Sequence, residues 1–143
     1  VKPAGGHAIY IDARAYLDKI PDNEYPADTL ALFIYAIGGV RSVAIGNLMY
    51  AEKDKNGKIL KAAKNDFVRL AIPRSVYSLE HLLFVANTLM KVNLRKAFIT
   101  RGVKVRGELR NDGFDHFDCE MDLIDKTSFE QAVLSMFESD EKS

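Results

Sequence analysis

The sequence predicts an α+β fold, a mostly antiparallel sheet with helices packed on one face. Segments with the alternation of a strand and segments with helical spacing both occur, but they do not alternate strictly along the chain. Strand-like segments are joined by hairpin-length connections at two places, around Asn56-Gly57 and around Asn111-Asp112-Gly113. A doubly wound parallel sheet, the alternative, requires a more regular succession of strands and helices.

The first half of the chain is predicted to contain two strands and two helices. Pro21 ends a short helix that follows the first strand, and Pro26 opens a longer helix that ends at Gly38-Gly39. Gly46 lies inside the second strand and is expected at a bulge or a close approach. The predicted bounds are a strand over 7–13, a helix over 15–20, a helix from Pro26 to Gly38, and a strand over 40–50.

The second half is predicted to contain three strands and two helices. Pro73 ends the first of these strands, and Ser78 is suited to cap the helix that follows. Ser128 is expected to cap the last helix, with Gln131 as its capping-box partner. The predicted bounds are strands over 67–72, 103–109 and 114–124, a helix from Ser78 to about residue 92 with the apolar stripe Leu79, Leu82, Val85, Ala86 and Leu89, and a helix over 128–137.

The composition excludes several classes of function. The 20 Lys and Arg residues balance the 20 Asp and Glu residues, so no overall charge attracts nucleic acid or an anionic membrane. No apolar run approaches the roughly 20 residues of a membrane span and no signal peptide is found, so a cytoplasmic protein is expected. Cys119, the single cysteine, excludes an internal disulfide and is expected in the core. His7, His81 and His116 lack the spacing of metal ligands, so no metal site is expected.

Arg69 is the most informative candidate for a binding site. It lies inside an apolar strand and shares a face with Phe67 and Ala71. Arginine is almost never fully buried without a partner, and its planar fork fits a carboxylate through two parallel hydrogen bonds. Arg69 is therefore a candidate clamp for a ligand carboxylate. The alternatives are an ion pair with an internal Asp or Glu, and an edge-strand arginine whose guanidinium reaches water.

His116 is a second candidate. It lies in the last predicted strand, on the face opposite to Phe117 and Cys119. A histidine titrates near neutral pH, so His116 is suited to carry a proton or to form a polar wall. The alternative is a half-exposed histidine on the solvent face of the strand.

Four runs of residues resemble one known family. They are AGGHAIYIDA (4–13), KIPDNEYPADTLA (19–31), GVRSVAIG (39–46) and VRLAIPRSVY (68–77). They are similar to the carboxy-terminal region of the tryptophanase and tyrosine phenol-lyase family, the pyridoxal-phosphate-dependent (PLP-dependent) β-eliminating lyases. The last run is close to the family signature VRLTIPR-x-VY. The resemblance is good from Pro3 to Val92, weakens over 93–113, returns over 114–124 and is absent from 125 onward.

The resemblance implies a fold-type-I enzyme of amino-acid metabolism. Residues 1–124 would form its small carboxy-terminal domain, and residues 125–143 would add an extra helix and a charged tail. In this family the arginine of the signature grips the α-carboxylate of the amino-acid substrate, and Arg69 occupies that position. The implied partners are the large domain of the same polypeptide and further copies of the protein, because the family is tetrameric.

Two positions of the chain can be compared with residues that differ between tryptophanase and tyrosine phenol-lyase. Tyrosine phenol-lyase holds its phenol with an arginine in the motif RSxxRG, where this chain has RSVAIG and therefore Ile45. Tryptophanase has a His-Phe pair near its active site, which His116-Phe117 matches after a two-residue insertion. Both positions resemble tryptophanase, which converts L-tryptophan to indole, pyruvate and ammonia. The alternatives are a lyase for another amino acid, such as tyrosine or a cysteine conjugate, and a stand-alone, non-catalytic ligand-binding or interaction module.

The resemblance also implies that the catalytic centre lies outside this chain. The Schiff-base lysine and the phosphate cradle of the family belong to the large domain, and no lysine here lies in a similar context. The 143-residue chain is therefore expected to be inactive by itself. It begins without an initiator methionine and a strand pattern starts almost at once, which predicts either a piece of a longer polypeptide or a trimmed chain.

Overall fold

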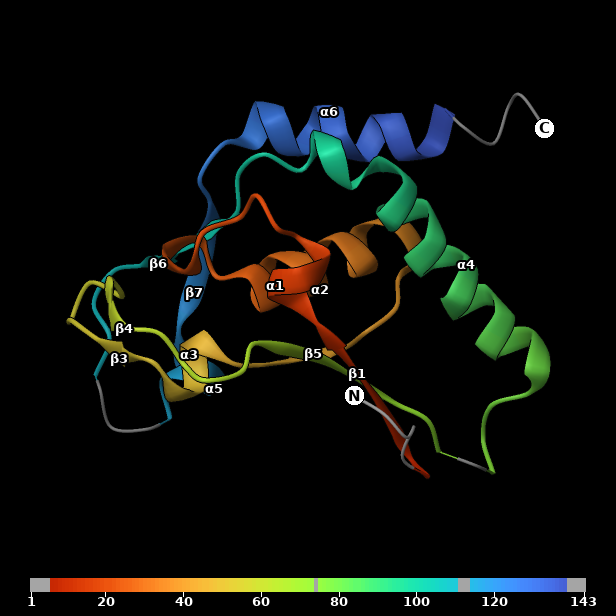
Figure 1. Ribbon diagram of the computed structural model, residues 1–143, viewed down its shortest axis with the longest axis horizontal. Coiled ribbons are helices and arrows are strands. Elements are labelled where there is room, and N and C mark those ends of the chain that lie inside the picture. Colours follow the sequence, from red (N-terminus) through yellow and green to blue (C-terminus); the bar gives the residue numbers. More distant parts are fainter. Residues whose placement is uncertain (1–5, 74, 111–113, 139–143) are drawn as a thin grey trace.

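A computed structural model describes residues 6–73, 75–110 and 114–138, and it confirms the α+β class (Figure 1). The strands are β1 (Ala8–Asp12), β2 (Val43–Ile45), β3 (Glu52–Lys53), β4 (Ile59–Lys61), β5 (Phe67–Ala71), β6 (Val103–Arg106) and β7 (Glu120–Leu123). The helices are α1 (Ala13–Tyr16), α2 (Pro26–Gly38), α3 (Asn47–Tyr50), α4 (Leu79–Arg95), α5 (Asp115–Asp118) and α6 (Lys126–Phe137), with 3-10 turns over Asp22–Glu24 and Lys96–Phe98.

The described strands pair antiparallel, but they form three small sheets in place of a single one. The largest has the order β1-β5-β2, while β3 pairs with β4 and β6 with β7. The predicted turn at Asn56-Gly57 is confirmed, because it joins β3 to β4 and Gly57 has a φ of 79° that favours glycine. The second predicted turn, at 111–113, lies outside the described residues.

Helices cover one face of the β1-β5-β2 sheet. α2 packs against β2 and β5, and α4 and α6 pack against α2 and against each other (Figure 1). Val68 and Leu70 of β5 point to this side, with 0% and 5% of their surface exposed. A smaller apolar cluster lies around Tyr25 and includes Ile59 of β4 and Val103 and Val105 of β6. The larger cluster is formed by Ala13, Leu17, Ile20, Ala27, Leu30, Phe33, Ile34, Val68, Val92, Ile99, Ala132 and Met136.

The last helix takes part in the larger cluster. Ala132 and Met136 of α6 are buried there, and the ring of Phe129 lies with its centroid 4.9 Å from that of Phe33 in α2. Figure 1 shows α6 lying across one side of the molecule, above α2 and the end of α4. Residues 126–137 therefore complete the same hydrophobic core as the rest of the chain. Their status as an addition to the family's small domain stays a prediction.

Two helices begin earlier than predicted, because an aspartate caps each of them. α1 follows Asp12, whose side chain accepts a hydrogen bond from the backbone N–H of Ala15 at 3.1 Å. α6 follows Asp125, whose side chain accepts one from the backbone N–H of Ser128 at 2.9 Å. Ser128 therefore lies inside the helix, and the predicted capping box with Gln131 is wrong.

The predicted strand over 40–50 is wrong in its second half. Val43–Ile45 pairs with β5, and α3 follows almost at once. A Cβ at Gly46 would meet Oδ1 of Asp66 at 1.8 Å, which confirms the predicted close approach. The same oxygen accepts a hydrogen bond from the backbone N–H of Asn47 at 2.8 Å. This contact turns the chain out of the sheet and into a helical turn.

The predicted strand over 114–124 is wrong in its first half. α5 occupies Asp115–Asp118, and β7 begins only at Glu120, where it pairs with β6. The buried side chain of Asp115 accepts a hydrogen bond from the backbone N–H of Arg110 at 2.9 Å. This bond holds a turn in a segment whose alternation predicts a strand. β6 likewise ends at Arg106, before the predicted end of its strand.

Ser78 caps α4 as predicted, but of the predicted apolar stripe only the end at Leu89 packs against the larger cluster. Leu79 is 70% exposed and Leu82 is 36% exposed. Thr88 and Val92 are the buried residues of α4 instead. The helix is turned so that its second half meets α2, and the apolar side chains of its first half remain on the surface.

Asp28 is a carboxyl group in the first turn of α2. Its Oδ2 is sealed from solvent and has no hydrogen-bond partner within the described parts of the chain. Burial, with the Asp66 carboxylate as a second cause, raises the pKa of Asp28 to about 7, although the charge of Lys53 acts against this rise. The folded protein therefore holds the Asp28 proton at pH values where an exposed aspartate has lost it.

The protein is expected to lose stability as the pH rises from about 4 to about 7. In this window the unfolded chain has released the Asp28 proton while the folded chain keeps it, so the free energy of unfolding falls by about 2–4 kcal/mol. Asp28→Asn is expected to remove this loss. Urea unfolding of both proteins across the window measures the effect. Stability curves that run parallel at all pH values would contradict the assignment.

Candidate functional site

Arg69 lies at the centre of the β1-β5-β2 sheet, on the face that the helices leave open. β5 is the middle strand, and Arg69 pairs with Tyr10 of β1 and with Val43 of β2. Residues directly opposite each other in antiparallel strands share a face. On the next pair, Phe67 stands opposite Ile45. We call the surface formed by Tyr10, Val43, Ile45, Phe67 and Arg69 the open sheet face.

The guanidinium of Arg69 has no acidic partner among the described residues. Arg69 is half-buried, and among the residues that the structure describes no carboxylate lies within ion-pair distance of it. In contrast, Arg14 pairs with Asp22 at 2.7 Å and Arg101 with Glu24 at 3.0 Å. Neither alternative from the sequence fits this position, because β5 is not an edge strand and no described acid engages the side chain. The role of Arg69 as a carboxylate clamp stays a prediction.

Ile45 lies beside Arg69 on the open sheet face. Ile45 and Phe67 line a pocket of about 330 Å³ together with Tyr50 and the loop residues Ala63, Lys64 and Asn65. The rings of Phe67 and Tyr10 meet edge to face, with centroids 6.2 Å apart. An apolar and aromatic surface therefore adjoins the cation. This combination suits an amino acid with an apolar ring.

A buried polar network holds the corner that carries Ile45. The side chain of Asp66, just before β5, accepts hydrogen bonds from the backbone N–H groups of Ala27 at 3.0 Å and Asn47 at 2.8 Å. Asn47 is fully buried, and its Oδ1 accepts a hydrogen bond from Arg14 at 3.2 Å. The network joins β5 to α1, α2 and α3. No sequence motif indicates this network. The one local signal is the pair Gly46-Asn47, a glycine followed by a polar residue inside an apolar run.

The structure places His116 apart from the sheet that carries Arg69. His116 lies in α5, and its ring packs on that of Phe117 with centroids 3.9 Å apart. α5 packs against α3, which follows Ile45 and Gly46 in the chain. The helix that carries His116 therefore packs against the helix that follows Ile45 and Gly46. Its contact with a substrate stays a prediction.

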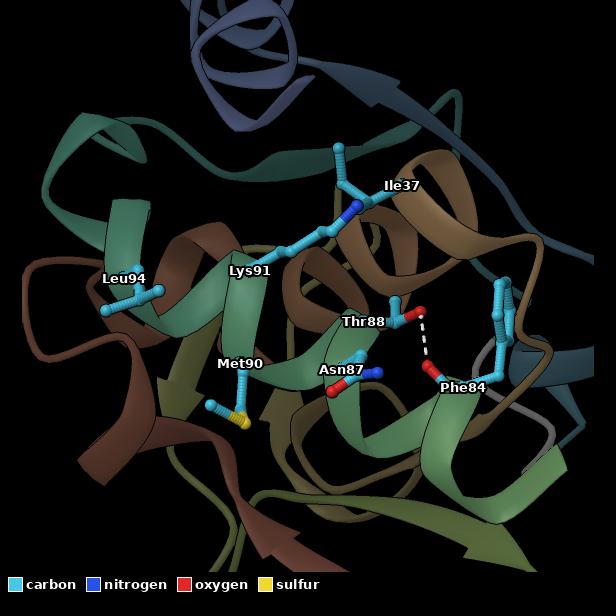
Figure 2. A pocket seen from close by; sticks show the side chains of 7 residues that line it. All are labelled: Ile37, Phe84, Asn87, Thr88, Met90, Lys91 and Leu94. Carbon is cyan, nitrogen blue, oxygen red and sulfur yellow. Dashed lines mark hydrogen bonds between the residues drawn. The ribbon is translucent and has the colours of Figure 1, made fainter. Parts of the chain in front are cut away.

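A second pocket lies in the helix layer, on the other side of the sheet from Arg69. Figure 2 shows this pocket between α2 and α4, where the hydroxyl of Thr88 donates a hydrogen bond to the carbonyl of Phe84 at 3.0 Å. Lys91 supplies its cation, but Lys91 has an interaction within the protein. The pocket is therefore a weaker candidate for a carboxylate. It has a volume of about 350 Å³ and is lined by Ile37, Phe84, Asn87, Thr88, Met90, Lys91 and Leu94.

Among the described residues, neither the cysteine nor a cluster of metal ligands offers a competing site. Cys119 packs against the smaller apolar cluster, and burial raises the pKa of its thiol, which disfavours the nucleophilic thiolate. Within the described ranges no three His, Cys, Asp or Glu side chains gather as metal ligands. None of the described helices has the length and apolar character needed to cross a membrane.

Comparison with known proteins identifies the family, although no protein-family model matches the chain. A protein of Trichomonas vaginalis named "Probable beta-eliminating lyase" is 44% identical over 123 residues, which make up 86% of this chain and 26% of that protein. A tryptophanase of Rhodobacter capsulatus is 39% identical over 124 residues, 87% of this chain and 26% of the tryptophanase. This chain belongs to the tryptophanase and tyrosine phenol-lyase family.

The chain corresponds to the carboxy-terminal part of these β-eliminating lyases and spans 26% of the length of the two relatives above. Overall identity does not separate the two subfamilies. A tyrosine phenol-lyase of Pasteurella multocida is 46% identical over 92 residues, 64% of this chain and 20% of that enzyme.

The expectation that the PLP site of the family lies outside this chain stays a prediction. A phosphate cradle needs glycines whose backbone leaves room for the ligand. A Cβ added at Gly46, Gly57 or Gly102 would meet another part of the chain itself, whereas Gly39 and Gly107 have open space beside them. Lys64 lines the pocket beside Ile45, but it is exposed on a loop, whereas a nucleophilic lysine is desolvated or placed beside another cation. We assign no step of cofactor chemistry to this chain.

Proposed function

We propose that the complete protein is a PLP-dependent lyase that converts L-tryptophan, or a similar amino acid, to indole, pyruvate and ammonia, and that this chain supplies the clamp for the substrate carboxylate. The observation that carries the proposal is the position of Arg69. Its guanidinium has no acidic partner within the described residues and lies at the centre of the open sheet face. Relatives named tryptophanase and tyrosine phenol-lyase support the class of reaction.

Arg69 would act by orienting the substrate. Two parallel hydrogen bonds from the guanidinium to the α-carboxylate fix the orientation of the bonds at Cα, so that one C–H bond stands in the position for proton removal. PLP, held by the rest of the polypeptide, supplies the electron-withdrawing ring that makes this proton acidic. The chain by itself is expected to bind a carboxylate without turning over the amino acid.

Ile45 and His116 would lie at the other end of the substrate. Ile45 and Phe67 present an apolar wall that accepts an indole ring. A phenol hydroxyl at the same wall would lose its hydrogen bonds to water, which disfavours tyrosine. His116 would approach the leaving group from α5 as a polar wall.

Ile45→Arg is expected to change the preference of the complete enzyme for its leaving group. An arginine at this position fills the apolar pocket and offers a donor to a phenol oxygen, so indole release from L-tryptophan should fall about tenfold or more relative to phenol release from L-tyrosine. Steady-state kcat/KM values for both substrates measure the ratio. Ile45→Leu serves as the matched control and should keep it. An unchanged ratio in the arginine variant would remove Ile45 from the site.

A lyase for tyrosine or another amino acid is the second candidate, because the tyrosine phenol-lyase of Pasteurella multocida is as similar to this chain as the tryptophanases are. Faster release of phenol than of indole by the complete protein would establish this function. A stand-alone binding module would instead bind small carboxylates at Arg69 and turn over none of these amino acids.

A further inference from the structure

A third pocket, of about 410 Å³, lies on the core side of the β1-β5-β2 sheet. It is bordered by α2, the strand β2, the β6-β7 pair and the start of α6, and its apolar walls include Leu32, Val103, Met121, Leu123 and Phe129. Two of its lining residues are polar, Asp28 and Ser42. Ser42 precedes Val43, whose side chain lies on the open sheet face, so the alternation along the strand directs Ser42 to the opposite side. The pocket is therefore separate from Arg69.

Both polar residues have a buried oxygen that lacks a hydrogen-bond partner among the described residues. Oδ2 of Asp28 and Oγ of Ser42 are sealed from solvent, and neither has a hydrogen-bond partner in the parts of the chain that the structure describes. Buried polar atoms in folded proteins almost always have a partner, which is a protein group, an ordered water or a ligand. The two residues that carry these atoms line one largely apolar pocket, which points to a shared partner from outside the chain.

We infer that this pocket binds a small organic ammonium ion with an apolar stem, which donates hydrogen bonds to Asp28 and Ser42 and packs its stem against the apolar walls. A carboxylate and a hydroxyl oxygen are both acceptors for an N–H donor, and the bond to the carboxylate is strengthened by charge. An apolar stem displaces water from Leu32, Met121 and Phe129. Water alone would supply hydrogen bonds to the two oxygens, but it would leave the apolar side chains of the pocket in contact with water.

The charges around Asp28 allow this binding mode. The negative charge of Asp66, just before β5, raises the pKa of the Asp28 carboxyl, and the positive charge of Lys53 in β3 lowers it. Asp28 in turn raises the pKa of the Tyr25 phenol. Lys53 is held by the backbone carbonyls of Leu48 and Ala51 at 2.8 and 3.1 Å and donates no hydrogen bond to Asp28 that the structure describes. Lys53 therefore leaves Oδ2 of Asp28 without a hydrogen bond among the described residues.

N-Methyl-2-phenylethylamine tests the inference in the complete protein. It has two N–H donors on an apolar stem, and as a secondary amine it forms no neutral imine with an aldehyde cofactor. Calorimetric titration is expected to show saturable binding that Asp28→Asn weakens about tenfold or more. The methyl ether of the same shape, 1-methoxy-2-phenylethane, should bind as weakly to the original protein as the amine does to the variant. Arg69→Ala should leave amine binding unchanged.

The pH dependence of amine binding provides a second test of the same inference. The amine stays protonated while the Asp28 carboxyl ionises with a pKa of about 7, so binding should strengthen roughly tenfold from pH ~6 to ~8 and this change should vanish in Asp28→Asn. Ala31→Leu, which narrows the pocket from α2, should also abolish binding in a folded protein. No saturable binding, or equal binding by the original protein and Asp28→Asn, would overturn the inference and leave ordered water as the occupant.

Discussion

Replacing Arg69 by alanine is expected to lower kcat/KM of the complete enzyme by about 30-fold to 5,000-fold, because a charged, bidentate hydrogen-bonded pair contributes about 2–5 kcal/mol when one partner is removed. The variant should fold normally, since Arg69 has no acidic partner in the described structure and its side chain lies on the open sheet face. The loss should appear in kcat as well as KM, because the clamp also orients the Cα–H bond for proton removal.

Two further variants control for loss of charge and loss of packing. Arg69→Lys keeps the charge but not the planar fork, so it should recover only part of the activity. Arg106→Ala removes an exposed arginine of β6 that pairs with Glu120 and Asp122, and it should stay within about twofold of the original enzyme. Kinetics of Arg69→Ala that match those of Arg106→Ala would contradict the clamp.

Replacing Asp66 by alanine is expected to have the largest effect on stability. Asp66 is 1% exposed, and its carboxylate accepts hydrogen bonds from the backbone N–H groups of Ala27 and Asn47. Alanine leaves both N–H groups buried without an acceptor, so the free energy of unfolding should fall by about 3–5 kcal/mol. The corner between β2 and α3 would lose its support, and with it the position of Ile45.

Denaturant unfolding followed by circular dichroism measures this effect. Asp18→Ala changes an exposed aspartate of the same chain and should stay within about 0.5 kcal/mol of the original protein. Asp66→Asn should be intermediate, because the amide keeps one acceptor but turns an NH₂ group toward a donor. A change below about 1 kcal/mol for Asp66→Ala would show that the network does not stabilise the fold.

The residue pattern of the sequence predicts those helices and turns that are determined by interactions between residues close in the chain. The proline and glycines that bound α2, the Ser78 cap of α4 and the turn at Asn56-Gly57 all act within a few residues. The predictions at 46–50 and 114–118 fail, because Asp66 and Asp115 hold those segments by hydrogen bonds that the alternation of apolar residues does not reveal. The exposure of Leu79 and Leu82 in α4 has a similar cause, because the face that a helix buries depends on its neighbour, here α2.

The candidate site likewise has a part that the sequence predicts and a part that it does not. A cation inside an apolar strand was enough to single out Arg69, and the register of β5 then places Tyr10, Val43 and Ile45 around it. The resemblance to the lyase family, not the residue pattern, directed attention to Ile45. The polar network of Asp66 and the unpartnered oxygen of Asp28 were not predictable, because burial of a polar group depends on contacts distant in sequence.

The interaction of Arg69 with a carboxylate is tested most directly by two inhibitors that differ in one group. Indole-3-propionate carries a carboxylate and no amine, and indole-3-propionamide is its neutral counterpart. Inhibition constants are measured for both, with the complete enzyme and with Arg69→Ala. The account predicts that the variant binds the acid about 30-fold more weakly or worse while its affinity for the amide is unchanged. Equal losses for both inhibitors, or no loss for either, would contradict the assignment of Arg69 as the carboxylate clamp.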